Sequence, residues 1–281
     1  MRERLTITLK KEILDELDAH IDGERLRNRS HAIEYYLSKS LGQKALKVLI
    51  LAGGRPAEFG AEKKLPKAMV KIAGKPLLEH TLKRLKSEKF SEVVISVGEG
   101  GEAISGYFKD GEQIGIKINY LEQRHGTKGT ASALSQAKDF FKSGTFLLLY
   151  GDVLSELDYG EFLEFHRAQK SSICTMALTS VDTPKMWGMA KLSGSKIVSF
   201  EEKHEKPKTF SHLVNAGIYA MEPGIFNYIK PEAAKMESDV FPRMAEENKL
   251  SGFAFESLWL DVSNSAAYKQ AVKEIDKNDK I

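Results

Sequence analysis

Two aspartates far apart in the chain each follow a short apolar run, a placement that suits metal chemistry. Asp152 comes after the run from Phe146 to Tyr150 and a glycine, and Asp261 comes after Trp259-Leu260. Such runs indicate buried strands, so both carboxylates are expected at strand ends. Mg²⁺ prefers carboxylate oxygens, with phosphate oxygens and water at its other positions. The pair predicts a magnesium site that faces a triphosphate, although either aspartate alone is as typical of a turn or a helix cap.

A glycine pair after another strand-like run could bind phosphate. The run from Val48 to Leu51 is short, apolar and branched, and Ala52-Gly53-Gly54 follows it. Glycines bring bare backbone N–H groups close to a ligand, which suits phosphate oxygens. Lys67, at the end of the next loop, could close over the same phosphates. The spacing is neither that of the P-loop nor that of the dinucleotide fold, and a plain tight turn is the alternative interpretation.

The stretch from Lys47 to Pro76 resembles the signature of the sugar-phosphate nucleotidyltransferases. It contains a strand, Leu-Ala-Gly-Gly, a basic loop, Pro-Lys, a second short strand at Ala68 to Ile72, and Gly-Lys-Pro-Leu-Leu-Glu. The resemblance extends over residues 47–281. It implies an enzyme that transfers a nucleotidyl group from a nucleoside triphosphate to a sugar 1-phosphate, releases pyrophosphate and requires Mg²⁺. It also implies that Asp152 and Asp261 bind the metal and that Lys67 and Lys203 are catalytic.

The same resemblance implies which residues hold the two substrates. The nucleotide-binding residues are Leu51, Ala52, Gly53, Gly54, Gln123, Gly129, Thr130 and Asp152. The sugar-phosphate-binding residues are Gly151, Glu202, Lys203, Asn215 and Gly217. Gln123 would read the base, Glu202 would hold sugar hydroxyls, and Lys203 would hold the sugar phosphate. The alternatives are a Gly-Thr helix start at Thr130 and a buried strand with a capping Asn215.

The loop after the glycine pair departs from the family pattern. Most members carry Gly-Thr-Arg-Leu there, and that arginine steadies the transferring phosphate. Here the loop begins with Arg55 and places Glu58 where the arginine belongs. A glutamate beside a triphosphate would repel it, so either Arg55, Lys63 or Lys64 substitutes or turnover is impaired. We expect Arg55 to be the third catalytic residue.

Two other functions stay open at this point. The large domain could belong to a transcription regulator that only senses a nucleotide or a nucleotide-sugar, and Glu58 favours this alternative. The acceptor could also be a non-sugar alcohol phosphate such as inositol phosphate or phosphocholine, because Leu65 to Gly74 looks like those relatives as well.

Strand-like and helix-like segments alternate over residues 47–281. Leu77 to Lys86 and Ala131 to Phe141 have helical patterns, and Glu92 to Val97 has the pattern of a strand. This predicts an α/β fold: a mostly parallel, Rossmann-like nucleotidyltransferase sheet with helices on both faces, preceded by a small β-α-α module. Ligands of such sheets bind beyond the carboxyl ends of the strands, which is where the candidate residues fall.

Residues 1–43 are predicted to form that separate module, ahead of the domain at 47–281. Arg4 to Lys10 alternates polar and apolar side chains, which predicts a half-buried strand. Two helices follow, the second beginning at the N-cap Ser30 and ending at Gly42. So short a module cannot bury its own core, and a lone strand leaves an open edge. Pairing of two chains solves both problems and predicts a homodimer or a higher homo-oligomer.

This pattern resembles the ribbon-helix-helix DNA-binding family over residues 2–42. In that family a two-stranded ribbon enters the major groove, so double-stranded DNA is the implied partner. The implied DNA-binding residues are Arg2, Arg4, Thr6 and Thr8 on the ribbon, and Asn28, Arg29 and Ser30 at a phosphate. Residues 1–42 hold eight basic and eight acidic residues, so a plain dimerisation module is the alternative.

Composition limits the remaining possibilities. The chain of 281 residues has a formal net charge of +3, which implies no general polyanion binding. Its single cysteine, Cys174, excludes an internal disulfide framework and a cysteine-built zinc site. No apolar stretch approaches the roughly 20 residues that a membrane span needs. The N-terminus lacks the apolar core of a secretory signal, so we expect a cytoplasmic protein without membrane association.

Overall fold

A computed structural model describes residues 6–23, 26–44, 47–58, 64–124, 129–203 and 211–278. The chain forms two compact units, Met1–Ala45 and Leu46–Ile281. Three residues named above lie outside the described residues: Arg2 and Arg4, predicted to read DNA bases, and Lys63, one of the possible substitutes for the missing arginine.

The N-terminal unit contains two helices, α1 (Lys11–Ala19) and α2 (Arg29–Lys44). Asn28 caps the second helix, because its side-chain oxygen accepts a hydrogen bond from the backbone N–H of His31 at 2.9 Å. The predicted N-cap, Ser30, lies inside the helix, and so does Gly42, the predicted end. Both predictions were wrong. Asn28 and Ser30 can each cap a helix, and the earlier of the two does so here. At the other end, the helix continues past Gly42 to Lys44.

Only Thr6 to Lys10 of the strand predicted from Arg4 to Lys10 lies among the described residues. Thr6 to Lys10 makes no strand pairing among the described residues, and Ile7 and Leu9 are 45% and 36% exposed. These side chains are not half-buried within one chain, and the expected pairing with a second chain stays a prediction. The buried side chains of this unit that cluster together are Leu17, Leu26 and Ala32.

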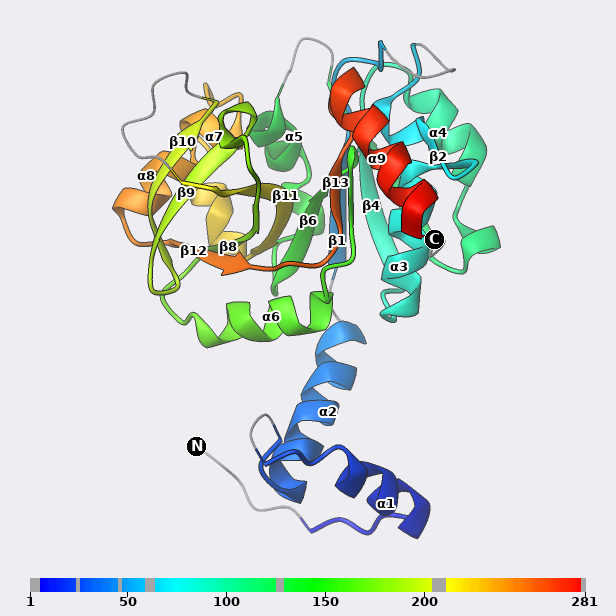
Figure 1. Ribbon diagram of the computed structural model, residues 1–281, viewed down its shortest axis with the longest axis vertical. Helices are drawn as coiled ribbons and strands as arrows, with labels where there is room; N and C mark the ends of the chain where they lie inside the picture. Colours follow the sequence, from blue (N-terminus) through cyan, green and yellow to red (C-terminus); the bar gives the residue numbers. More distant parts are fainter. Residues whose placement is uncertain are drawn as a thin grey trace. The chain divides into compact units, whose positions relative to one another are not determined.

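The second unit is built on a nine-stranded sheet with the order β5-β4-β1-β6-β11-β8-β12-β10-β9 (Figure 1). The first four strands in this order are parallel to one another. They are β5 (Lys117–Glu122), β4 (Glu92–Val97), β1 (Lys47–Ala52) and β6 (Phe146–Tyr150). This half of the sheet has the parallel arrangement that the alternating pattern predicts.

The other half of the sheet is largely antiparallel. It contains β11 (Leu213–Met221), β8 (Cys174–Ser180), β12 (Leu250–Ala254), β10 (Lys196–Glu202) and β9 (Gly188–Ser193). Here β12 and β8 are parallel, whereas β11 runs against β6 and β8, and β10 runs against β9 and β12. Only Gly194 and Ser195 join β9 to β10, and so short a connection allows only an antiparallel pair. The sheet is mixed, and the prediction of a mostly parallel sheet overstated its parallel part.

Helices cover both faces of the sheet (Figure 1). Val48 and Ile50 of β1 pack in one core, and Leu49 and Leu51 pack in the other, because successive strand residues point to opposite faces. The first core includes side chains of α3 (Leu77–Ser87), α4 (Gly101–Phe108) and α6 (Tyr159–Ala168). The second includes side chains of α5 (Thr130–Gln136), α7 (Met236–Asp239) and α8 (Phe241–Glu246). Strands buried on both faces have continuous apolar sequences, which is why they were recognisable.

Short elements complete the unit. Two strand pairs lie outside the main sheet, β2 (Lys71–Ile72) with β3 (Lys75–Pro76) and β7 (Val153–Ser155) with β13 (Trp259–Asp261). The last helix is α9 (Ser265–Asn278), and 3₁₀ turns span Lys67–Met69, Glu112–Ile114, Lys138–Phe140, Pro184–Met186 and Pro223–Asn227. No helix in the described part of the chain is long and apolar enough to cross a membrane.

Two of these turns correct sequence predictions. Ala68 to Ile72 was predicted as a strand, and of these residues only Lys71–Ile72 forms one. Met69 donates its N–H to the carbonyl of Pro66 at 2.8 Å and closes a 3₁₀ turn instead. The helix predicted from Ala131 to Phe141 stops at Gln136 and is followed by a separate 3₁₀ turn. In both cases most of the apolar side chains are buried, and the backbone hydrogen bonding is what differs from the prediction.

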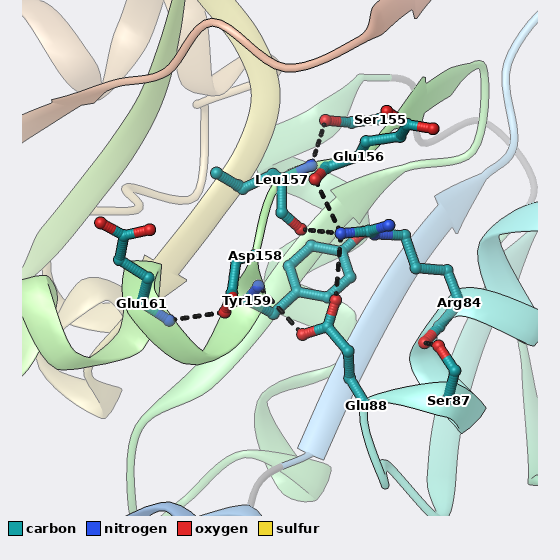
Figure 2. Close-up of polar contacts among 9 residues, drawn as sticks. All are labelled: Arg84, Ser87, Glu88, Ser155, Glu156, Leu157, Asp158, Tyr159 and Glu161. Atoms are coloured by element: carbon teal, nitrogen blue, oxygen red, sulfur yellow. Dashed lines mark hydrogen bonds and ion pairs between the residues drawn. The ribbon is translucent and has the colours of Figure 1, made fainter. Parts of the chain in front are cut away.

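Figure 2 shows how Arg84 of α3 holds the segment that leaves β7. Its guanidinium donates hydrogen bonds to the carbonyl oxygens of Glu156 and Leu157, at 2.7 and 2.8 Å. Glu88, one turn along the helix, lies 3.3 Å from the guanidinium and accepts the first backbone N–H of α6. Because β7 begins directly after Asp152, these contacts stabilise the backbone beside a predicted metal ligand.

Candidate active site

A cleft of about 1260 Å³ opens at the carboxyl ends of β1, β4, β5 and β6. Its lining includes every nucleotide-, sugar-phosphate- and metal-binding residue predicted from the sequence, together with Arg55, Lys67 and Lys203. Parallel strands bring their carboxyl ends to one edge of a sheet, so residues distant in sequence meet there. The fold therefore assembles one site from these separate motifs.

The glycine pair lies against Gln123. A Cβ atom on Gly53 would approach the side-chain Nε2 of Gln123 to 2.4 Å, so a side chain at this position would displace the amide. Gln123 donates its backbone N–H to the carbonyl of Val97 at 2.9 Å, and its side chain donates to the hydroxyl of Ser96 at 3.3 Å. Gly54 has φ +100°, a conformation that glycine adopts without strain. The bare backbone and an oriented amide are thus adjacent at the bottom of the loop.

The loop residues Arg55 and Glu58 differ in their relation to the cleft. Arg55 is exposed and lines it, whereas Glu58 is exposed and is not among the lining residues. Lys64, another possible substitute, is exposed and also lies outside the lining. Glu58 occupies the position of the family's arginine in the sequence, but it does not line the cleft. Arg55 does line the cleft, so of these three loop residues it is the one that can face a substrate there.

Lys67 points to the carboxylate of Asp152, with Nζ 3.7 Å from Oδ2. The lysine opens the 3₁₀ turn that follows Pro66, and the buried Ala68 and Met69 anchor this turn in the core. About 29% of the lysine side chain and 27% of the aspartate side chain remain exposed. The ammonium group is thus fixed beside the predicted metal ligand and remains open to a substrate.

The two aspartates are neighbours through the β7–β13 pair. Asp261 is paired with Val153, and the carbonyl of Asp152 accepts the backbone N–H of Val262 at 2.9 Å. Burial and, secondly, the charge of Asp261 raise the pKa of Asp152, while Lys67 opposes this shift. Two carboxylates that repel each other beside open space form a donor set that fits a hard divalent cation.

This donor set is small. Among the described residues, no group of three or more His, Cys, Asp or Glu side chains could surround a metal ion. Mg²⁺ keeps several waters and is often held by one or two carboxylates together with substrate phosphates. The pair of Asp152 and Asp261 therefore fits a magnesium ion that shares its coordination with a nucleotide.

Glu202 and Lys203 lie at the end of β10 and line the cleft. Burial and, next, the charge of Glu237 raise the pKa of Glu202, with Lys203 and Lys235 opposing that shift. Lys203 Nζ lies 3.8 Å from Glu202 Oε1, and Lys203 has a positive φ of 42°, which is uncommon for a residue with a side chain. The cleft thus has a second charged cluster, formed by two acids and two lysines.

Asn215 and Gly217 lie on β11, where the strand pairing with β8 is irregular. The side-chain oxygen of Asn215 accepts the backbone N–H of Gly217 at 3.0 Å, and its amide nitrogen donates to the hydroxyl of Tyr219 at 2.7 Å. Gly217 has φ +72°, and a Cβ atom there would lie 3.1 Å from the ring of Tyr150. Asn215 therefore lines the cleft while its own hydrogen bonds shape the strand.

Thr130 has a structural role at the same time as it lines the cleft. Its hydroxyl donates to Glu237 Oε2 at 2.7 Å and accepts the backbone N–H of Met236 at 2.8 Å. The neighbouring Gly129 has φ +100°, and a Cβ atom on it would meet the carbonyl oxygen of Ala234 at 2.2 Å. These contacts fasten the start of α5 to α7.

Sequence reasoning missed several residues of the cleft. Glu237 accepts hydrogen bonds from both Thr130 and Tyr150, and Trp187 donates its indole N–H to Asp261. Lys235 also lines the cleft. None of these residues belongs to a recognised motif. Glu237 lies on α7 and Trp187 directly precedes β9. No local sequence pattern marks either residue as part of the site.

The predicted DNA-binding residues belong to the N-terminal unit. Thr6, Thr8 and Ser30 are exposed, and Asn28 is occupied as the helix cap. Arg29 is exposed but paired: its Nε donates to Asp18 Oδ1 at 2.7 Å, and a second guanidinium nitrogen pairs with the other carboxylate oxygen. This ion pair joins α1 to α2, so Arg29 has a structural role that the sequence did not suggest.

The model of the nucleotidyl transferase family matches residues 47–278. The chain belongs to this family. The match confirms the resemblance read from the second unit. It begins after the N-terminal unit and gives no support to a ribbon-helix-helix domain there.

Relatives in the nucleotidyl transferase family are enzymes that act on different sugars and bases. A probable mannose-1-phosphate guanylyltransferase 1 from Oryza sativa subsp. japonica is 32% identical over 233 residues, or 79% of this chain and 63% of the relative. A UTP–glucose-1-phosphate uridylyltransferase from Synechocystis sp. is 28% identical over 82% of this chain and 63% of its own length. The chain thus spans less than two thirds of the length of these curated relatives.

A solved structure has the same fold. It is the crystal structure of a putative glucose-1-phosphate thymidylyltransferase from Bacillus anthracis in complex with a sucrose. The two structures superpose with a TM-score of 0.74 at 25% sequence identity, covering 82% of this chain and 95% of the other. The fold of a nucleotidyl transferase therefore extends over nearly all of the second unit.

Proposed function

We propose that this protein transfers a nucleotidyl group from a nucleoside triphosphate to a sugar 1-phosphate in a Mg²⁺-dependent reaction. The observation that supports this most strongly is the meeting of Lys67, Asp152 and Asp261 beside the glycine pair in one cleft. When bound, Mg²⁺ would be held by the two aspartates and would neutralise charge on the phosphate oxygens.

In the proposed reaction, an oxygen of the sugar 1-phosphate attacks the α-phosphorus of the triphosphate. The new O–P bond forms as the bond to the bridging oxygen breaks, and the electron pair leaves with pyrophosphate. The protein needs to align the phosphates and balance their charge, and contributes little covalent chemistry. Arg55 and Lys67 line the cleft beside the glycine pair and are assigned to the triphosphate, and Lys203 is assigned to the sugar phosphate.

The remaining roles are assigned from the residues that line the cleft. Gln123 lies against Gly53, so its amide is assigned to the edge of the base. Glu202 is assigned to sugar hydroxyls, because a buried carboxylate is destabilising unless it accepts hydrogen bonds and the hydroxyls of a bound sugar can donate them. Gly151 and Gly217 leave room for the sugar, since both line the cleft without a side chain.

Pyrophosphate release tests this function. ATP, CTP, GTP, UTP and dTTP are each paired with glucose 1-phosphate, mannose 1-phosphate, inositol phosphate and phosphocholine, with Mg²⁺ present. At least one sugar 1-phosphate should give turnover, and Asp152→Asn should lower it on the order of 10²-fold or more. Turnover only with a non-sugar phosphate would correct the acceptor. No turnover with any pair, in protein that circular dichroism shows to be folded, would overturn the proposal.

We also propose that the N-terminal unit pairs with that of a second copy and binds double-stranded DNA. Of the eight large hydrophobic residues that are exposed among the described residues, five lie in this unit. They are Ile7, Leu9, Ile13, Tyr36 and Leu37. Apolar surface gathered on so small a unit favours burial against a partner. Ile7 and Leu9 belong to the segment that is predicted to pair with the same segment of a second copy.

Sedimentation of the full chain tests the pairing. Ile7→Glu should shift the protein toward monomer, whereas Val198→Glu, at an exposed position of the second unit, should leave the sedimentation coefficient unchanged. Anisotropy of a labelled DNA duplex tests the second part, and bound DNA should be released as salt is raised. If the protein is a dimer but binds no duplex at low salt, the N-terminal unit is a dimerisation module that does not bind DNA.

A further inference from the structure

Trp187 joins two parts of the cleft that the motifs treat separately. It lies between the 3₁₀ turn Pro184–Met186 and β9, and no recognised motif includes it. Its indole Nε1 donates a hydrogen bond to Asp261 Oδ2 at 2.5 Å, across 74 positions of sequence. Its backbone carbonyl accepts the N–H of Lys203 at 3.4 Å. One residue therefore contacts both a candidate metal ligand and the backbone of a candidate sugar-phosphate ligand.

The carboxylate of Asp261 is held at both oxygens. Oδ2 accepts the indole N–H of Trp187, and Oδ1 accepts the backbone N–H of Ser263 at 2.6 Å. Two donors on different oxygens fix the rotation of the carboxylate about its last bond. Each oxygen keeps a further lone pair, so the group can still bind a cation while both hydrogen bonds persist.

Trp187 is itself held in place. Its ring packs edge-on against Trp259, with ring centroids 5.8 Å apart. Trp259 is fixed in turn, because its indole N–H donates to the carbonyl of Ala216 at 2.9 Å. A Cβ atom on Gly188, the next residue, would lie 2.4 Å from the ring of Phe200, so only glycine lets this strand approach so closely. The indole of Trp187 thus has little freedom to leave Asp261.

We propose that Trp187 is a positioning residue whose indole N–H orients Asp261 toward the metal. This inference rests on the proposed function, because it assumes that Asp152 and Asp261 bind a divalent cation. Groups that hydrogen-bond a metal-ligating side chain fix its orientation, and their loss typically lowers metal affinity by about 10- to 100-fold. The backbone carbonyl of the same residue accepts the N–H of Lys203, so Trp187 lies next to both the candidate metal ligand and the candidate sugar-phosphate ligand.

Binding of Mn²⁺, followed by the electron paramagnetic resonance signal of the free ion, tests the proposal without turnover. Trp187→Phe keeps the ring packing but removes the indole donor, and it should raise the Kd for Mn²⁺ by about 10-fold or more. Trp259→Phe is the matched control, because phenylalanine keeps an aromatic ring beside Trp187 and the indole N–H that is lost binds Ala216 and not Asp261. It should change the Kd by less than about three-fold. Equal affinity of wild type and Trp187→Phe would overturn the inference.

The kinetics provide a second measurement. In Trp187→Phe the apparent affinity for Mg²⁺ should fall, and high Mg²⁺ should restore most of kcat. Trp187→His, which retains a ring N–H donor, should recover part of the Mn²⁺ affinity. A defect that neither metal nor histidine reduces would indicate a purely structural role and would contradict the proposal.

Tryptophan emission covers the case in which Trp187→Phe does not fold. The chain has two tryptophans, so Trp259→Phe leaves Trp187 as the sole emitter. Its emission should change on addition of Mn²⁺ and on introduction of Asp261→Asn, because the indole N–H faces that carboxylate. If neither Mn²⁺ nor Asp261→Asn changes the emission of Trp187, the inference is overturned. If the wild-type protein binds no Mn²⁺ with or without nucleoside triphosphate, the proposed metal dependence of the reaction is itself wrong.

Discussion

At the scale of single residues, Arg55 and Glu58 show that the position of a charge along the loop does not decide what it faces. Arg55 lines the cleft, and Glu58 does not. Arg55→Ala should lower kcat/KM for pyrophosphate release by about 10²- to 10³-fold, because one donor to the developing phosphate charge is lost. Steady-state kinetics with the substrate pair identified in the panel measures this effect.

The matched variant is Glu58→Ala, which should leave kcat/KM within about two-fold, since a charge outside the cleft and exposed to solvent is screened. A large gain of activity in Glu58→Ala would show that the glutamate does repel the triphosphate. The family's arginine would then have no functional substitute in Arg55.

A second prediction at this scale concerns Gly129. Its φ is +100°, and a Cβ atom at this position would lie 2.2 Å from the carbonyl oxygen of Ala234, which leaves no room for a side chain. Gly129→Ala should lower the free energy of unfolding by about 3 kcal/mol or more, from backbone strain and from displacement of α7. Urea unfolding measures the loss.

Gly144 provides the control for this substitution. It has φ +76°, but a Cβ atom there would meet nothing within 4 Å. Gly144→Ala should therefore cost only the left-handed conformation, about 1 kcal/mol. Similar losses in the two variants would mean that the contact between Gly129 and Ala234 is easily relaxed.

At the scale of elements, α3 and the segment after β7 are held together by Arg84. The guanidinium donates to two carbonyl oxygens and pairs with Glu88, and its buried Nε has no hydrogen-bond partner among the described residues. Arg84→Met should lower the free energy of unfolding by about 2 kcal/mol, because the bonds from a charged group are lost while the apolar stem is kept.

Lys83, the preceding residue of α3, is the matched position. Its side chain is 49% exposed and pairs with Glu79 one turn earlier. Lys83→Met should therefore change stability by less than about 1 kcal/mol, as is usual for a surface ion pair. If thermal unfolding shows equal losses for both variants, Arg84 does not hold the segment that follows Asp152.

At the scale of the whole molecule, the two units differ in how much core they contain. The N-terminal unit buries a cluster of Leu17, Leu26 and Ala32, whereas the second unit has large cores on both faces of its sheet. If the first unit is stabilised by a second copy, its stability depends on protein concentration. Amide hydrogen exchange should slow in α1 and α2 as the concentration is raised, and stay constant in β1 and β6.

Exchange in the N-terminal helices that does not depend on concentration would contradict the proposed pairing. The Ile7→Glu variant is the control, since it should show the fast exchange at every concentration. Neither result bears on the nucleotidyl transferase unit, whose activity is measured separately.

Several features follow from local sequence. The run from Val48 to Leu51 forms β1, and Phe146 to Tyr150 forms β6, because strands buried on both faces need continuous apolar residues. The glycine pair and Asp152 could be assigned to a phosphate and metal site because they directly follow these strands. The resemblance over residues 47–281 added Lys203 and Asn215, and both line the cleft.

Other features were decided only by tertiary structure. Trp187 reaches Asp261 across 74 positions, and Thr130 reaches Glu237 across 107. The choice of Asn28 over Ser30 as a cap also depended on the start of the helix, which the ion pair between Arg29 and Asp18 helps to fix. By itself, the sequence determined which segments are buried and which strand ends carry the chemistry. The partners that orient the carboxylates came from the fold, because a hydrogen bond between distant elements depends on how those elements pack, and short-range patterns do not encode that.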